Sequence, residues 1–222
     1  MGRCGDPALV IGVRSVRRDL IILANSRKMG NRCIAGIDAS SGEWVRPCFG
    51  AGEEGIPWPV RQVDGVEPKL LDVISIPLAD DGPHRDIQPE NCTLLEGAWR
   101  RVGEAKTKDV RRHVQKTGFV LHDAHSHIPV SALRRLHEAD RASLCLVEAH
   151  VEFTTEGTRR GKRVNAAFTF GCYTYCLPVT DFEFERQFPA YSRDEADCLL
   201  AVSLGTPFGN CCYKFAAGVI RL

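Results

Sequence analysis

Short apolar runs separated by turn residues recur along the first 98 residues of the 222-residue chain. Met29-Gly30-Asn31 separates two of these runs, and Gly and Asn tolerate the positive φ angles of a tight hairpin turn. The pattern predicts strands over residues 20–24, 33–37, 44–45, 70–78 and 92–95. Five short strands without alternating helices predict a small antiparallel barrel.

A second strand-rich region follows residue 142. Apolar and polar residues alternate over residues 145–153, which is the period of a half-buried strand. Residues 156–162 read as a hairpin tip, and residues 164–170 alternate again on the return strand. Gly171 then shifts the phase of the pattern, so we expect a bulge there.

The remainder of this region predicts a helix and two further strands. Asp181 begins a helix-like segment that ends at Phe188, and strands are predicted near residues 198–204 and 211–220. Three strands, a helix and two strands are the order of an OB-fold, so the second half fits an OB barrel better than the first half does.

The expected fold is therefore mainly β, with two tandem OB-like antiparallel barrels joined by a helical segment. Residues 99–115 are rich in basic side chains and poor in apolar ones, so they predict a weakly amphipathic helix or helical linker. A solvated face is favoured there over a strip that faces a polyanion. The predicted units are an N-terminal arm at 1–17, a first OB-like domain at 18–98, a basic helical connector at 99–141 and a second OB-like domain at 142–222.

Charge and composition narrow the possible functions. The chain has 29 basic and 28 acidic residues, so its net charge of +1 draws it to neither nucleic acid nor anionic lipid, and a polyanion site must be a local patch. No apolar run approaches the ~20 residues that span a bilayer, and the start lacks a secretory apolar region. We expect a cytoplasmic protein. Its ten cysteines include no Cys-x-x-Cys pair and read as small buried hydrophobes rather than disulfides or metal ligands.

One basic cluster falls within residues 25–48, where a hairpin and the next strand bring its members together. Arginine and lysine beside a groove neutralise phosphates, and tryptophan can stack on a base. The alternative for the basic residues is that they are ordinary solvated charges, with Arg46 paired to Glu43 or Asp38. The alternative for the tryptophan is packing in the core. The candidate nucleic-acid-binding residues here are Arg27, Lys28, Arg32, Trp44 and Arg46.

A second candidate group lies in the later half. The hairpin tip carries Arg159, Arg160 and Lys162, at the loop between the first two strands of an OB barrel, which often contacts ligand. Tyr173 and Tyr175 are two residues apart and would share one face of a strand, although packing is the favoured interpretation of both rings. Lys214 on the final strand is expected to face the same groove.

Two polar groups have weaker interpretations. One group is expected mainly to support the long irregular loop at residues 49–68; its members are His84, Gln88, Glu90 and Asn91. Glu90 could also hold a ribose hydroxyl or pair with Arg46.

His122, Asp123, His125 and His127 are metal-ligand types, but no complete metalloenzyme spacing is present, so no metal or other cofactor is expected. No nucleophile is paired with a base, so no catalytic residue is assigned and a binding module is favoured over an enzyme.

Several of these segments together resemble a known family. They are Ser26-Arg27-Lys28 with Gly30, CIAG at 33–36, WVRP at 44–47, LLDVISIPL at 70–78, His84 with QPEN at 88–91, and the closing SLGTPFGNCCYKFAAGVIRL. This set resembles the dual OB-domain proteins, bacterial proteins of two tandem OB-like barrels. The resemblance implies nucleic-acid or nucleotide binding, in the setting of bacterial defence or conflict systems.

The leading hypothesis is non-catalytic binding of single-stranded DNA or RNA, or of a nucleotide, through basic grooves of the two barrels. The second hypothesis is an interaction or sensor module that docks a partner protein through the loop at 49–68. The third is metal-dependent hydrolysis at residues 122–127.

Overall fold

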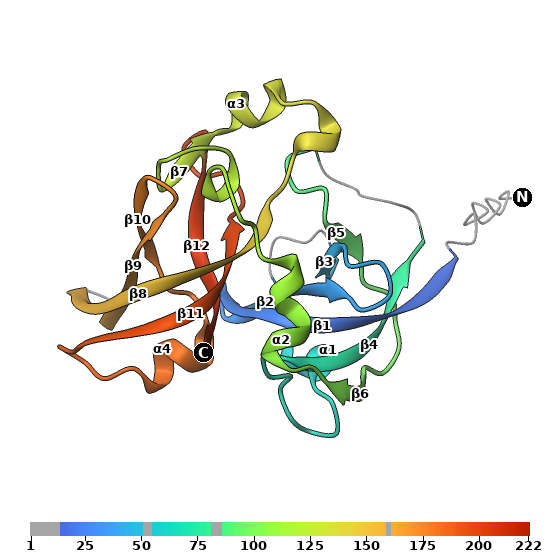
Figure 1. Cartoon of the computed structure of the whole chain (residues 1–222). Coiled ribbons are helices and arrows are strands. Elements are labelled where there is room, and N and C mark those ends of the chain that lie inside the picture. Colours follow the sequence, from blue (N-terminus) through green and yellow to red (C-terminus); the bar gives the residue numbers. More distant parts are fainter. Residues whose placement is uncertain (1–13, 51–54, 81–85, 159–160) are drawn as a thin grey trace, which may run out of the picture.

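The computed structural model describes residues 14–50, 55–80, 86–158 and 161–222. It forms two six-stranded sheets that lie side by side, one from each half of the chain (Figure 1). The first contains β1 (Ser15–Lys28), β2 (Asn31–Asp38), β3 (Trp44–Cys48), β4 (Asp72–Ala79), β5 (Asn91–Thr93) and β6 (Arg100–Glu104), with helix α1 (Trp58–Arg61) between β3 and β4. All five strands predicted before residue 98 are confirmed.

The first sheet closes on itself. β1 pairs antiparallel with β2 and β4, β2 pairs with β3, and β5 runs parallel to β3. An antiparallel bridge between Leu78 and Leu94 joins β4 to the chain just after β5. The circular order β1-β2-β3-β5-β4 is that of an OB barrel. The first half therefore fits this fold as well as the second. Helix α1 takes the place of the OB-fold helix between the third and fourth strands; it is only four residues long and lies in a Gly- and Pro-rich loop, so the sequence pattern did not predict it.

The second barrel repeats this order. It contains β8 (Leu144–Thr158), β9 (Gly161–Phe170), β10 (Tyr173–Pro178), α4 (Phe182–Gln187), β11 (Arg193–Leu204) and β12 (Cys211–Arg221). β8 pairs with β9 and β11, while a parallel bridge between Val179 and Ala216 closes the sheet beside β10. Asp181 caps α4 by accepting hydrogen bonds from the backbone N–H groups of Glu183 and Phe184, as its position predicted.

Three local expectations need correction. Residues 100–104 form strand β6 against β4 rather than part of a helix, because their backbone completes the ladder of a sheet edge. β1 begins at Ser15, so the end of the expected N-terminal arm is strand. Gly171 has a φ of 60° in the turn between β9 and β10, so it ends a strand instead of forming a bulge within one.

The segment between the barrels is mostly short helices. It contains α2 (Thr107–Val110), strand β7 (His127–Pro129), which extends the second sheet beside β12, and α3 (Val130–Arg135), with 3-10 turns at Arg111–His113, Val120–His122 and Glu138–Asp140. Within the described residues, no helix combines the length and apolar character that crossing a bilayer requires.

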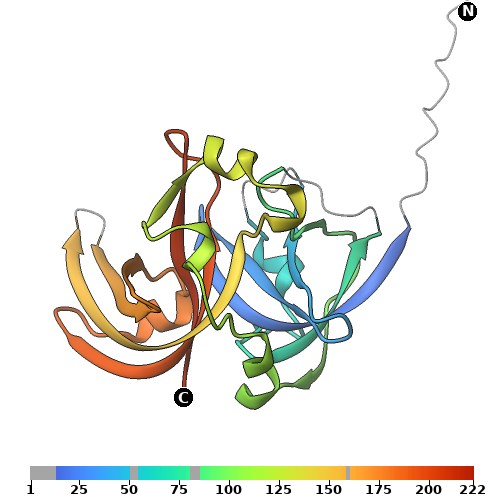
Figure 2. The ribbon, with the colours of Figure 1, turned by 45° about the horizontal axis from the view of Figure 1, so that its top comes forward.

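An apolar core shared by both barrels fixes how they sit together. Ile21 and Leu23 of β1 belong to the same buried cluster as Leu199 of β11 and Ala217 of β12. The β1 and β12 backbones approach so closely that a Cβ added at Gly218 would lie 1.8 Å from the Leu23 carbonyl oxygen. Figure 2 shows both curved sheets meeting along this seam. A side chain at position 218 is therefore incompatible with the observed packing.

Replacing Gly218 by Ala is expected to lower the free energy of unfolding by about 3 kcal/mol, the upper end of the usual cost of overpacking. The matched control is Gly103→Ala in β6, where the nearest atoms to an added Cβ lie 3.9 Å away on Val73. Urea unfolding followed by tryptophan fluorescence compares the two variants. Equal stability of both would contradict the close approach of the barrels.

Candidate functional site: a cationic cavity between the barrels

A cavity of about 280 Å³ lies where the first barrel meets the second. The hairpin between β1 and β2, strand β3 and the approach to β5 form one side of it. These are the strand face and the loops through which OB barrels bind ligands. Residues 203–206 at the end of β11 and Phe215 of β12 cover that face from the other barrel. The second barrel thus narrows an open groove into a partly enclosed cavity.

Four predicted residues line this cavity, namely Arg27, Lys28, Arg32 and Arg46. Among the described lining residues none is acidic. The remaining lining combines apolar groups such as Ile56 and Phe215 with polar side chains such as Thr180 and Ser203. An anion that enters the cavity therefore meets positive charge on several sides.

Arg46 lines the cavity and is only 4% exposed. Its Nη1 donates to Asn91 Oδ1 at 2.9 Å and to Ser143 Oγ at 3.0 Å, and its Nη2 donates to Ser203 Oγ at 3.2 Å. These partners are neutral, and neither of the acids considered from the sequence, Asp38 or Glu43, is paired with it. Neutral dipoles therefore solvate the buried guanidinium.

The polar residues expected to brace the long loop instead join the two barrels. Glu90 accepts hydrogen bonds from the backbone N–H groups of Ser143 at 2.7 Å and Leu144 at 3.1 Å, and from the Ser143 hydroxyl at 2.6 Å. Gln88 donates to the Leu204 carbonyl at 3.0 Å and accepts from Asn91. Gln88 and Asn91 also line the cavity, so the groups that hold the barrels together shape the site.

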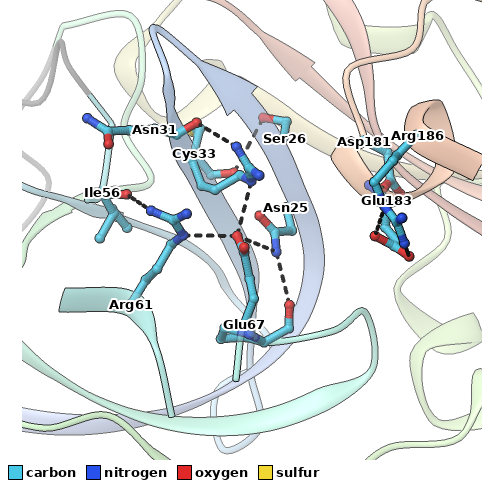
Figure 3. A network of polar contacts seen from close by, with 12 residues as sticks. Asn25, Ser26, Asn31, Cys33, Ile56, Arg61, Glu67, Asp181, Glu183 and Arg186 are labelled. Atoms are coloured by element: carbon cyan, nitrogen blue, oxygen red, sulfur yellow. Dashed lines mark hydrogen bonds and ion pairs between the residues drawn. The ribbon is translucent and has the colours of Figure 1, made fainter. Parts of the chain in front are cut away.

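Arg32 is held by a carboxylate on the wall of the first barrel. Glu67 Oε1 lies 3.0 Å from Arg32 Nε and 2.9 Å from Arg61 Nε, so one acid serves two guanidinium groups (Figure 3). The Phe182 ring lies 3.5 Å from the Arg32 guanidinium carbon and covers its face. Burial lowers the pKa of Arg32, and the Glu67 carboxylate opposes this shift. The pair of arginines leaves an excess of positive charge beside the cavity.

Arg27 is the half-exposed member of the group. Its guanidinium forms an ion pair with Glu185 of α4, across the boundary between the barrels. Glu185 itself is not part of the cavity lining. The arginine therefore fixes α4 and still presents charge to the cavity.

Other predicted site residues lie elsewhere. Trp44 packs against the core shared by the barrels, which is the packing alternative. Tyr175 is 2% exposed, and its hydroxyl accepts from Val120 N–H and donates to the Asp123 carbonyl, so its ring is not available to a base. Lys214 is fully buried in an ion pair with Asp123 at 2.7 Å rather than facing an open groove. The burial of Lys214 corrects the expectation, because inward-facing positions of a closed barrel have no access to solvent. The burial of Tyr175 is the packing that the sequence favoured.

Of the remaining candidates, the two that the structure describes, Tyr173 and Lys162, do not line the cavity either. The Tyr173 ring lies 4.7 Å from that of Phe119 and packs on the second barrel's core. Lys162 donates a hydrogen bond to the Phe188 carbonyl. His84, Arg159 and Arg160 fall outside the described residues.

The His-rich segment makes local contacts. His122 Nε2 contacts the Ala142 carbonyl at 2.6 Å, and the His125 and His127 rings lie 6.4 Å apart. In the described part of the chain, no group of three or more His, Cys, Asp or Glu side chains is arranged to hold a metal ion.

Sequence reasoning missed the contributions of the second barrel, above all Ser143, Ser203 and Phe215. Ser203 and Phe215 belong to the closing segment that carries the family resemblance. The sequence therefore marked this segment as characteristic of the family, but it did not predict that these two residues line a cavity.

Comparison of the sequence with models of known protein families agrees with this architecture. The family model of the dual OB-containing domain matches residues 18–219, nearly the whole described chain. The chain belongs to this family. Among curated proteins and among solved structures nothing matches. Membership in the dual OB-containing domain family is consistent with a binding module built on OB barrels.

In this family member, Asp123→Asn is expected to lower the free energy of unfolding by about 3 kcal/mol, because it leaves the buried Lys214 ammonium without its carboxylate. Burial already lowers the pKa of Lys214. Without the Asp123 carboxylate, the pKa of Lys214 falls further. As the pH rises from this lowered pKa toward the ordinary pKa of lysine, the ammonium of the folded variant loses its proton, so the free energy of unfolding should rise. Urea unfolding across a pH series measures both effects.

The control is Asp140→Asn, an exposed site where the change should stay within about 0.5 kcal/mol. Adding Lys214→Met to Asp123→Asn should restore stability. A double variant less stable than Asp123→Asn alone would show that the ion pair is not the cause.

Proposed function

We propose that this protein binds a nucleotide without altering it, either free or as the end residue of single-stranded DNA or RNA. The ligand occupies the cavity between the barrels, where Arg27, Lys28, Arg32 and Arg46 face its phosphate. The observation that carries the proposal is this cationic lining, without an acid among its described members, on the face that OB barrels use for ligands.

The size of the cavity favours one nucleotide over a continuous strand. Its 280 Å³ lies near the lower limit of about 300 Å³ for small-molecule pockets. Residues 203–206 cover the β2–β3 face, so a strand cannot run across the first barrel as it does over an open OB barrel. Phe49 and Phe215 offer apolar contact for a base beside the basic groups.

Binding rather than chemistry fits the character of the lining. Its hydroxyls and thiols, such as Ser26 and Cys33, have no histidine or carboxylate beside them among the described lining residues. The partner-docking hypothesis and a role in bacterial defence stay predictions.

A charge-neutral double variant tests the proposal. Arg27→Gln with Glu185→Gln removes one cation from the cavity while the net charge is unchanged. We expect roughly tenfold weaker nucleotide binding, since a hydrogen bond to a charged group contributes about 1.5–3 kcal/mol. Calorimetric titration with AMP and other mononucleotides at ~50 mM salt measures it, and wild-type affinity should fall as salt rises.

The matched control is Arg193→Gln with Glu152→Gln, an exposed ion pair on the second barrel with a 2.7 Å separation and no part in the cavity. It should bind as the wild type does. Absence of mononucleotide binding by the wild type, or equal weakening by both double variants, would refute the assignment.

A further inference from the structure

The second barrel has an outer face equivalent to the one that is covered in the first. It is formed by β9 and β10, with β12 beside β10 and β7 at the edge. Thr169, Thr174 and Cys176 are exposed on it, so this face is open to solvent. An open strand face of an OB barrel can take a single strand.

A hollow of about 250 Å³ lies on this face. Arg163 and Asn165 of β9, Cys176 of β10, and Tyr213 and Phe215 of β12 contribute to its walls. Phe215 also lines the cavity between the barrels. The hollow and the cavity are therefore neighbours with one aromatic ring between them.

Asn165 gives the hollow a specific chemistry. The residue is only 7% exposed, yet its side-chain amide forms no hydrogen bond with the described residues. The amide atoms are not among the fully buried, unpartnered polar atoms of the described chain, so they contact the solvent that fills the hollow. The amide thus presents an unused donor and acceptor pair to whatever enters the hollow. Asparagine forms such paired hydrogen bonds with adenine.

A row of exposed rings continues from the hollow. Tyr213 is 40% exposed and lies directly opposite His127 in the β12–β7 ladder. Their ring centroids are 5.5 Å apart, and the His125 ring lies 6.4 Å beyond His127. Bases stack on such rings, each contributing about 1–3 kcal/mol.

Arg163 supplies positive charge at the rim. It is exposed, and its side chain forms no ion pair with the described residues, although Glu156 lies opposite it on β8 and also lines the hollow. A guanidinium in this state can bind a backbone phosphate.

We infer that this hollow is a second subsite, which takes an unpaired adenine base of a single strand. The base stacks on Tyr213, Asn165 pairs with its edge, and Arg163 contacts the adjoining phosphate. This inference rests on the proposed function in one respect, that the terminal nucleotide of the strand occupies the neighbouring cavity.

Fluorescence anisotropy with a labelled oligo-dA of about eight nucleotides, within the ~4–16 that one OB barrel covers, tests the subsite. Tyr213→Leu should weaken oligo-dA binding about tenfold or more and leave the affinity for AMP unchanged. Asn165→Ala should remove a roughly tenfold preference for oligo-dA over oligo-dC. Because the Asn165 amide makes no bond within the described chain, this variant should also unfold at the wild-type urea concentration.

The matched control is Tyr191→Leu, an equally conservative change at a tyrosine that is 89% exposed and outside the hollow. The inference is overturned if Tyr213→Leu and Asn165→Ala bind oligo-dA like the wild type, or if the wild type binds no oligonucleotide. Weakening of oligo-dA by these variants in a protein that does not bind AMP would support the subsite while the cavity assignment fails.

Discussion

The arrangement of the two barrels depends on a buried arginine that belongs to one barrel and is hydrogen-bonded to the other. Arg46 lies on β3, and its guanidinium donates to Ser143, just before β8, and to Ser203 on β11. A buried guanidinium without hydrogen bonds would be very costly, so these contacts constrain where the second barrel can lie. The seam at Gly218 constrains it independently, through apolar packing and backbone approach.

This constraint changes what an OB barrel can bind. An isolated OB barrel offers an open groove to a strand, but here the end of β11 closes the groove of the first barrel into a small cavity. The basic side chains of the first barrel are gathered around a cavity of about 280 Å³. The second barrel keeps its corresponding face open. The two barrels share one topology and yet present different sites.

Much of the fold was accessible from the pattern of apolar positions. The strands of the first barrel and the Asp181-capped helix followed from local signals, because strand periodicity and helix capping are properties of neighbouring residues. β6 was missed, since its basic, exposed sequence is typical of a solvated helix as much as of an edge strand. The turn at Gly171 was wrongly predicted to be a bulge, because a turn and a bulge each place glycine where the alternation of apolar and polar residues shifts by one position.

For the site, the sequence by itself determined which groups carry charge and that Arg27, Lys28, Arg32 and Arg46 come from adjacent strands. Only the tertiary structure decided which of them share a cavity, that Lys214 and Tyr175 face inward, and that Ser203 and Phe215 of the other barrel complete the lining. The reason is physical. Strand pairing follows from local pattern and hairpin length, whereas packing between two barrels depends on contacts between residues about 100 or more positions apart, such as Arg46 with Ser143 and Ser203.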